Sequence, residues 1–113
     1  ETTRVMDAYF AALGTGQFNQ FFTDDVTWTT IQNNEQVCGA QAVEAAINGL
    51  HARMSDLQTR QLVVSNGFAY LEGSCAGKDE ARIPYCVAYE FAGDRIAAMR
   101  AFGEIATFMP TPE

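Results

Sequence analysis

The sequence is poor in basic residues and in histidine. Among its 113 residues, seven Lys and Arg stand against fourteen Asp and Glu, the formal net charge is −7, and His51 is the single histidine. A negative field of this size repels nucleic-acid phosphates and anionic lipid headgroups. We therefore expect neither nucleic acid nor a membrane surface as a partner.

Long apolar runs and cysteines are scarce as well. No apolar stretch approaches the roughly 20 residues that cross a bilayer, and the first residues lack the basic-then-apolar order of a secretion signal. The three cysteines, Cys38, Cys75 and Cys86, are too few for a disulfide framework, and none lies in a Cys-x-x-Cys pair or near the histidine. These absences predict a soluble, cytoplasmic protein without structural zinc.

Motifs for cofactors and for common catalytic machinery are also missing. The chain has no glycine-rich phosphate loop, no Ser-His-Asp spacing, no His-x-x-x-His pair and no carboxylate cluster with metal-ligand spacing. We therefore expect no cofactor and no metal site.

What the sequence does contain is the composition of one ordinary globular domain. Hydrophobic residues make up 48% of the chain and charged residues 19%, both within the usual range. At this length, folding removes roughly two-thirds of the extended chain's surface, which allows one core and not a second. We expect a single domain over residues 1–113.

Two amphipathic helices are predicted in the first half of the chain. Apolar residues recur at three- and four-residue spacing over residues 2–13, and again over residues 40–54 directly after Gly39. Between them, residues 18–22 fit a further helical turn that ends before an acidic turn at residues 24–25.

One strand is predicted before the second helix. Residues 26–31 are rich in β-branched and aromatic side chains, with Trp28 and Thr30 on one face. A polar excursion follows at residues 32–36.

Four antiparallel strands are predicted after the second helix. Residues 57–65 and 68–76 flank Asn66-Gly67, a strong hairpin signal in which both turn residues must accept positive φ. The other two strands are expected at residues 83–91 and 96–105, joined by a turn at residues 92–94. Helices followed by a meander, without alternating βαβ units, indicate an α+β fold in which one curved sheet wraps around the helices.

Alternation in the last two strands predicts which face is buried. Over residues 83–91, Tyr85, Val87 and Tyr89 share one face, while Glu90 falls on the other, so we expect the first face to be concave and buried. The faces of the last strand are Ala97, Met99, Ala101 and Gly103 against Ile96, Ala98, Arg100 and Phe102. If the small residues face inward they underfill the sheet, which predicts a cavity.

This order of elements resembles the nuclear transport factor 2-like (NTF2-like) superfamily, also called SnoaL-like. The supporting stretches are residues 9–13 (YFAAL), 22–28 (FTDDVTW) and 94–96 (DRI), with Gly39 before a helix. The resemblance covers nearly the whole chain and implies a cone-shaped, cystatin-like half-barrel in which a curved, mostly antiparallel sheet wraps around two or three helices. It also implies a deep apolar pocket and a homodimer formed through the other face of the sheet.

Two enzymatic branches are most similar. Residues 39–44 (GAQAVE) and 65–70 (SNGFAY) resemble limonene epoxide hydrolases, and residues 99–104 (MRAFGE) resemble bacterial ketosteroid isomerases. These branches imply isomerase, dehydratase or hydrolase chemistry on a small apolar substrate.

The catalytic groups of both branches are largely missing from this sequence. The isomerase pattern puts its oxyanion-stabilising tyrosine at Tyr9, but its two carboxylates fall at Thr30 and Val87. The positions of the hydrolase's Asp-Arg-Asp set and of its water-positioning aromatic and amide fall at Cys75, Gly73, Ala101, Trp28 and Thr30. Neither mechanism is supported, because each needs a placed acid or base.

Three catalytic candidates remain, namely Tyr9, His51 and Cys75. His51 lies four residues after Ile47 at the edge of the helix stripe. It is either a general base at the pocket mouth or a partly exposed histidine favoured by the helix dipole. Cys75 is either an inward nucleophile or, like most lone cysteines, a small buried hydrophobe.

The expected ligand site is an apolar pocket with phenols. Tyr9, Tyr85 and Tyr89 either form a ring of hydrogen-bond donors or are aromatic core residues. The full set of expected ligand-binding residues is Tyr9, Trp28, Thr30, Met54, Cys75, Tyr85, Val87, Tyr89, Met99 and Ala101. The function predicted is binding, with or without turnover, of a small apolar molecule that carries a carbonyl or hydroxyl. The alternatives are a ligand-binding module without chemistry and a dimeric protein-interaction domain.

The outer face of the sheet is expected to mediate the homodimer. Its apolar residues are Pro84, Cys86, Ala88, Ala98 and Phe102. Glu72 and Glu90 lie on the same face, where Arg82 or Arg100 are placed to pair with them.

Overall fold

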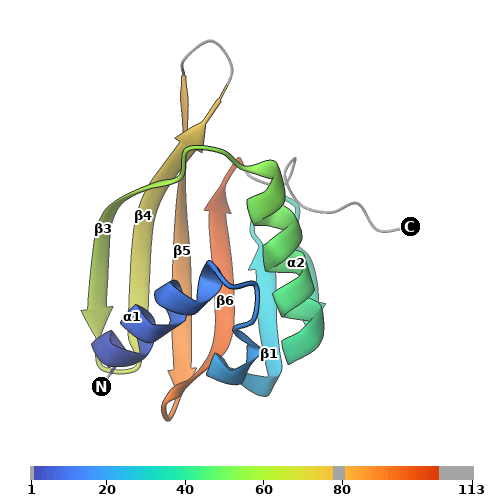
Figure 1. Cartoon of the computed structure of the whole chain (residues 1–113), viewed down its shortest axis with the longest axis vertical. Coiled ribbons are helices and arrows are strands. Elements are labelled where there is room, and N and C mark those ends of the chain that lie inside the picture. Colours follow the sequence, from blue (N-terminus) through green and yellow to red (C-terminus); the bar gives the residue numbers. More distant parts are fainter. Residues whose placement is uncertain (1, 78–80, 105–113) are drawn as a thin grey trace.

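The computed structural model describes residues 2–77 and 81–104 and contains helices in the first half of the chain (Figure 1). The helices are α1 (Thr2–Leu13), the short 3-10 helix η1 (Asn19–Phe21) and α2 (Ala40–Arg53). Their positions confirm the predicted helices. Among the described residues, no helix has the length and apolar character needed to cross a membrane.

The strands form one curved sheet behind the helices. They are β1 (Phe22–Thr30), β2 (Glu35–Cys38), β3 (Gln58–Ser65), β4 (Phe68–Ala76), β5 (Arg82–Ala92) and β6 (Arg95–Gly103). Across the sheet the order is β2-β1-β6-β5-β4-β3. The β1–β6 pair is parallel and the other pairs are antiparallel, so the fold is α+β with a mixed, mostly antiparallel sheet, as predicted.

Strand β2 corrects the prediction of a polar excursion at residues 32–36. It pairs with β1, with Glu35 opposite Thr30 and Cys38 opposite Thr27. Most of its side chains are exposed at the edge of the sheet, so the segment shows no apolar alternation. Backbone pairing with β1 therefore makes it a strand, and a side-chain pattern does not reveal such pairing.

Strand β1 begins earlier than predicted. Asp24 and Asp25 lie within β1, exposed, and not in a turn before it. The register with β6 shifts between Phe22 and Thr27, which is the irregularity that accommodates them. From Val26 onward the predicted alternation holds, with every second residue buried.

The β3–β4 hairpin turns where predicted, although its geometry differs in one respect. Ser65 pairs with Phe68 across Asn66-Gly67. Gly67 has a positive φ of 82°, whereas Asn66 does not have a positive φ. Only one of the two turn residues therefore needs the left-handed region.

The predicted faces of β5 are confirmed. Val87 and Tyr89 are 6% and 4% exposed and belong to the core, whereas Glu90 lies on the outer face and pairs with Arg100. Ala88 also lies on the outer face but is buried. Its cross-strand neighbours are the long side chains of Tyr70 and Arg100, which cover the small methyl group.

Ile96 corrects the predicted faces of the last strand. It is fully buried and does not lie on the outer face with Phe102. The register shifts here, because Ile96 pairs with Phe91 while Ala98 pairs with Glu90. The extra residue between them is a bulge that moves Ile96 to the inner face. The predicted end of this strand at Ile105 lies outside the described residues.

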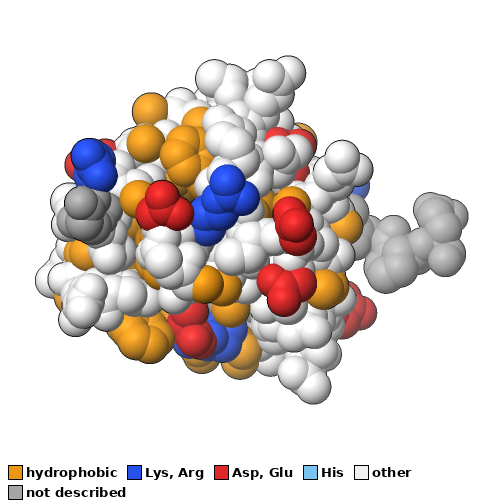
Figure 2. All heavy atoms as spheres, turned by 90° about the horizontal axis from the view of Figure 1, so that it is seen from below, with side chains coloured by type: hydrophobic (Ala, Val, Ile, Leu, Met, Phe, Trp, Pro, Cys, Tyr) orange, Lys and Arg blue, Asp and Glu red, His pale blue; other side chains and the backbone are white. Residues whose placement is uncertain are grey.

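Charges and apolar groups are mixed at the end of the molecule where the β3–β4 and β5–β6 hairpins turn. Figure 2 shows this end, with basic and acidic side chains interspersed among hydrophobic ones. The negative net charge is therefore not gathered there into a field of one sign.

Candidate functional site

A cavity of about 130 Å³ lies between the two helices and the concave face of the sheet. Its lining residues are Tyr9, Phe10 and Leu13 of α1, Trp28 of β1, Ile47, Leu50 and His51 of α2, Met54, Leu57, Thr59 of β3, Leu71 of β4, and Tyr85, Val87 and Tyr89 of β5. Hydrophobic and aromatic side chains dominate this lining, and none of its members is Asp, Glu, Lys or Arg. The cavity is therefore suited to an uncharged, largely apolar guest.

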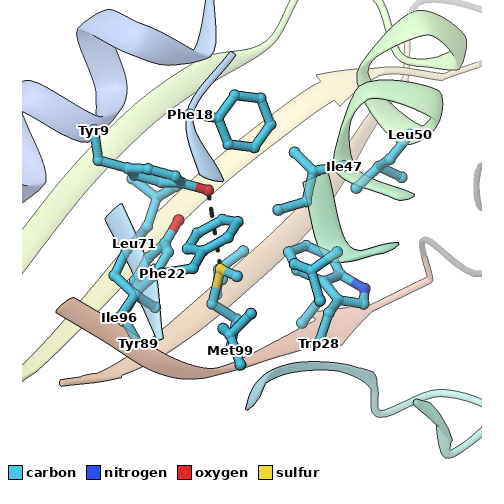
Figure 3. Packing of buried hydrophobic residues seen from close by; sticks show 14 of the residues in the cluster. Tyr9, Phe18, Phe22, Trp28, Ile47, Leu50, Leu71, Tyr89, Ile96 and Met99 are labelled. Atoms are coloured by element: carbon cyan, nitrogen blue, oxygen red, sulfur yellow. Dashed lines mark hydrogen bonds between the residues drawn. The ribbon is translucent and has the colours of Figure 1, made fainter. Parts of the chain in front are cut away.

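One end of the cavity lies beneath α1 and contains two phenols. The Tyr9 hydroxyl donates to Met99 Sδ over 3.9 Å, and the rings of Tyr9 and Tyr89 are 6.1 Å apart in an edge-to-face arrangement. Figure 3 shows both side chains reaching into the same region, with the Tyr9 hydroxyl directed at the Met99 sulfur.

The two phenols remain protonated in this surrounding. Burial raises the pKa of Tyr9 well above its ordinary value, and the neighbouring Tyr89 raises it further. Burial also raises the pKa of Tyr89, with Tyr85 and Cys86 as smaller causes. Both hydroxyls are consequently neutral hydrogen-bond donors across the whole physiological range.

The opposite end of the cavity lies beneath the segment that joins α2 to β3, which crosses the sheet away from α1 (Figure 1). Leu57 in this segment is 43% exposed, and Thr59 is also exposed. Because no other lining side chain is exposed, we infer that the cavity opens to solvent on this side. His51 and Tyr85, both half-buried, line this same end.

The imidazole of His51 is neutral at this opening. Burial lowers its pKa from the ordinary value of 6.5, because a charged imidazolium loses hydration in the partly apolar surrounding. A neutral imidazole offers one donor and one acceptor nitrogen. The side chain is thus able to accept a proton or a hydrogen bond from a guest.

The structure brings six of the ten expected ligand-binding residues to the cavity. These six are Tyr9, Trp28, Met54, Tyr85, Val87 and Tyr89. The other four, Thr30, Cys75, Met99 and Ala101, are buried but do not line it.

Larger side chains cover residues of that second group. The Trp28 indole donates to Thr30 Oγ1 over 3.2 Å, and the Tyr9 hydroxyl lies against Met99. Cys75 pairs with Ile83 near the end of β4 and is fully buried. These residues share the concave face without reaching the cavity surface.

Several lining residues were not among the expected binding residues. They are Phe10, Leu13, Ile47, Leu50, Leu57, Thr59 and Leu71. The helical spacing of the apolar residues marks Leu13, Ile47 and Leu50 as buried-stripe residues. That signal separates core from surface, but it does not separate a cavity wall from packed core.

Cys75 has the properties of a buried hydrophobe. Its side chain is fully buried, and burial raises its thiol pKa although Arg82 acts in the opposite direction. A protonated thiol without solvent access is a poor nucleophile.

The ion pairs lie outside the cavity. Glu90 pairs with Arg100, as predicted. Arg82 pairs instead with Asp56 over 2.6 Å, because it reaches the segment between α2 and β3. Within residues 2–77 and 81–104, no group of three or more potential metal ligands is present.

Comparison with known proteins gives a fold but no close relative. No family model matches the sequence, and no curated protein matches it. A steroid delta-isomerase from Pseudomonas aeruginosa is 12% identical, with a TM-score of 0.80, 94% of this chain covered and 81% of that chain covered.

Two further solved structures are similar at the same level. A SnoaL-like polyketide cyclase, so described provisionally, from Jannaschia sp. CCS1 is 12% identical with a TM-score of 0.75, covering 94% of this chain and 87% of that chain. A hypothetical protein with a ketosteroid isomerase-like fold from Catenulispora acidiphila DSM 44928, in complex with trimethylamine, is 12% identical with a TM-score of 0.68, covering 90% and 86%. The chain therefore has the NTF2-like fold, the fold of SnoaL-like and ketosteroid isomerase-like proteins.

Proposed function

We propose that the cavity binds a small apolar molecule that carries one carbonyl or hydroxyl group. The observation that carries this proposal is an uncharged, mostly apolar cavity with phenol groups at both of its ends. Its volume of about 130 Å³ is smaller than the roughly 300–1,000 Å³ of pockets for drug-sized ligands. A guest on the order of one six-membered ring with a polar substituent fits such a space.

Tyr9 is the hydrogen-bond donor we propose for the polar group of the ligand. Its hydroxyl donates to the Met99 thioether, and sulfur is a weak acceptor. A carbonyl or hydroxyl oxygen is a stronger acceptor, so exchanging the sulfur for a ligand oxygen favours binding. The resemblance to ketosteroid isomerases also implies a donating tyrosine at this position.

Proton-transfer catalysis is a second candidate function, favoured by one observation. His51 lines the cavity as a half-buried, neutral imidazole, the form that acts as a general base near neutral pH. For a substrate with a carbonyl group, double-bond isomerisation and elimination of water from the β-carbon both begin with abstraction of a proton next to that carbonyl. One observation does not favour catalysis. The resemblance to ketosteroid isomerases implies two catalytic carboxylates, but Thr30 and Val87 occupy their positions in this chain.

Binding is tested by ¹⁹F NMR titration with 4-fluorophenol. We expect saturable binding to the wild-type protein, and we expect Tyr9→Phe to weaken it about fivefold because one hydroxyl is lost while the ring remains. Tyr70→Phe is the matched control, because Tyr70 is exposed on the outer face. An absence of binding to the wild-type protein, or equal losses in both variants, contradicts the proposal.

Catalysis is tested separately by following deuterium exchange at the α-carbons of cyclohexanone in D₂O. If His51 is a base, the wild-type protein accelerates exchange over buffer and His51→Gln removes the acceleration. Binding of cyclohexanone without acceleration supports a ligand-binding module without chemistry.

We also propose that the outer face of the sheet joins two copies of the chain. Exposed apolar side chains lie on this face, among them Val63, Tyr70 and Phe102, each more than 40% exposed. A monomer leaves them in water, whereas a two-fold contact buries them. The alternative of an interaction domain with a filled cone is disfavoured by the cavity.

A further inference from the structure

We propose that Tyr85 and Gly73 together set the length of the cavity and restrict its guests to uncharged molecules with a single ring. This proposal rests on the proposed binding function and adds the size and charge class of the ligand. It is carried by the way Tyr85 is seated on the sheet.

Tyr85 lies in a row of the concave face that has glycine on both sides. It is opposite Gly73 of β4 and opposite Gly103 of β6, and Thr59 of β3 follows beyond Gly73. Side chains directly opposite each other in antiparallel strands have Cβ atoms roughly 5 Å apart and compete for space. Two glycines therefore leave Tyr85 without a competing neighbour on either flank.

The phenol uses the space on the Gly73 side. A Cβ atom added to Gly73 meets Tyr85 Cζ and the Tyr85 hydroxyl oxygen, each at 3.0 Å, and the backbone oxygen of Gln58 at 2.9 Å. The far end of the ring thus lies over the backbone of β4, and the ring extends along the sheet toward β3. A side chain at Gly73 lifts this ring off the sheet and into the cavity.

Gly103 is required for a different reason. Its φ is +119°, and an added Cβ lies 2.7 Å from the backbone oxygen of Pro84. This glycine is needed by the backbone itself. Gly73 has an ordinary φ, so its lack of a side chain matters for the space it leaves to Tyr85 and to the neighbouring strand.

The seated ring forms the wall at the open end of the cavity. Tyr85 lines this end together with Leu57, Thr59 and His51, so the apolar space ends where the phenol crosses β4. Removing the ring extends this space toward β3. Tyr85 is therefore the residue whose removal lengthens the cavity at its opening.

The hydroxyl of Tyr85 is available to a ligand. Among the described residues, none forms a hydrogen bond with it. Burial raises its pKa, Cys75 adds to this effect and Arg82 opposes it, so the group is a neutral donor. With His51 on the same end, two polar groups meet the part of a guest that faces the opening.

The lining also selects against charge. No Asp, Glu, Lys or Arg belongs to it, and burial lowers the pKa of His51, which keeps its imidazole neutral. An ion enclosed there therefore has no charged partner to offset its lost hydration. A negatively charged guest is further opposed by the net charge of −7. The class that fits is a single-ring phenol, alcohol or ketone.

The test uses three fluorinated probes in ¹⁹F NMR titrations, namely 4-fluorophenol, 6-fluoro-2-naphthol and 4-fluorobenzoate. We expect the wild-type protein to bind the phenol and to bind the two-ring naphthol about tenfold more weakly, because overfilling a rigid site is unfavourable. Binding of the benzoate is expected to be undetectable at neutral pH. Benzoate binding as tight as that of the phenol overturns the charge restriction.

The variants separate size from hydrogen bonding. Tyr85→Ala is expected to bind the naphthol more tightly than the phenol. Tyr85→Phe is expected to keep the preference for the phenol and to bind both probes more weakly than wild type. Gly73→Ala is expected to weaken phenol binding about tenfold, since the ring moves into the cavity, and the Gly73→Ala/Tyr85→Ala double variant recovers binding. Ile31→Ala, which removes an exposed apolar side chain outside the cavity lining, is the control and leaves both affinities unchanged.

The outcomes distinguish this inference from the proposed function. Wild-type protein that binds no probe overturns both. Wild-type protein that binds 4-fluorophenol while Tyr85→Ala retains the wild-type preference against the naphthol overturns the inference alone. If Gly73→Ala fails to fold in circular dichroism, because of the nearby Gln58 backbone, the Tyr85→Ala measurement decides the question.

Discussion

The carboxylate of Glu44 accepts a hydrogen bond of 2.8 Å from the backbone N–H of Phe18. The same oxygen accepts a second bond from the N–H of Asn19, and the other carboxylate oxygen accepts one from the Asn19 side chain. One residue of α2 therefore fixes the start of η1, and Phe18, the residue just before η1, is fully buried against Tyr9. The wall of the cavity beneath α1 is joined to α2 through this contact.

Glu44→Ala is expected to destabilise the protein by about 2 kcal/mol, because it removes charge-assisted bonds and leaves backbone donors without an acceptor. Urea unfolding followed by circular dichroism measures the change. Gln41→Ala on the exposed side of the same helix is the control and is expected to fall within about 0.5 kcal/mol of wild type. Equal stability of the two variants contradicts the role of Glu44.

Asp56 presents a second testable contact. Its carboxylate and its carbonyl oxygen both accept bonds from Arg82, at 2.6 and 2.7 Å, and its backbone has a positive φ of 53°. Asp56→Asn tolerates this backbone and removes only the exposed charge, so we expect a loss below about 1 kcal/mol. Alanine adopts a positive φ less readily than Asp or Asn, so we expect Asp56→Ala to lower the unfolding free energy by about 1 kcal/mol more than Asp56→Asn does.

Thermal unfolding at low and high salt separates these two contributions. Only the charge contribution is screened by salt. The difference in unfolding temperature between wild type and Asp56→Asn should therefore decrease in 1 M NaCl, whereas the difference between Asp56→Asn and Asp56→Ala should persist. If Asp56→Asn and Asp56→Ala unfold at the same temperature, the backbone argument is wrong.

Local patterns predicted most of the fold, and pairing decided the remainder. The helices α1 and α2 and the β3–β4 hairpin follow from apolar spacing and from Asn66-Gly67, which are properties of contiguous residues. Strand β2 is held by its partner β1, and the bulge at Ile96 is a relation between β5 and β6. Neither feature leaves a signal in its own segment.

The same distinction applies to the candidate site. Alternation predicted correctly that Tyr85, Val87 and Tyr89 face inward, because every second residue of a strand lies on the same face of the sheet. It did not reveal that Trp28 covers Thr30 or that Tyr9 lies on Met99. Whether an inward side chain forms a cavity wall depends on its neighbours in space, which parity does not describe.

The titration of His51 is a direct test of the opening of the cavity. As the single histidine of the chain, it gives one unambiguous imidazole signal in a ¹H–¹³C NMR titration. Burial lowers its pKa below 6.5 in the folded state, so we expect a midpoint below that of a histidine in an unfolded peptide. A midpoint at or above 6.5 contradicts the partly apolar surrounding.

This pKa shift also fixes the sign of a stability effect. Because the folded state binds the proton less well than the unfolded state, protonation of His51 favours unfolding. The unfolding free energy is expected to fall as pH decreases from about 7 through 6.5 toward the folded-state pKa. His51→Gln removes this contribution, so the difference in stability between wild type and the variant should depend on pH in that range and be constant above it.

The last prediction concerns the outer face of the sheet. Phe102 is 41% exposed there and lies opposite Cys86, with Glu72 on the next strand. If two copies meet on this face, Phe102→Glu places a charge against apolar side chains and beside an existing carboxylate, which disfavours association. Sedimentation velocity at micromolar concentration is expected to show a dimer for wild type and a monomer for Phe102→Glu. Gln41→Glu adds the same charge on the exposed side of α2, away from the sheet, and serves as the control for net charge. A wild-type monomer, or a variant with unchanged mass, shows that these side chains do not form the interface.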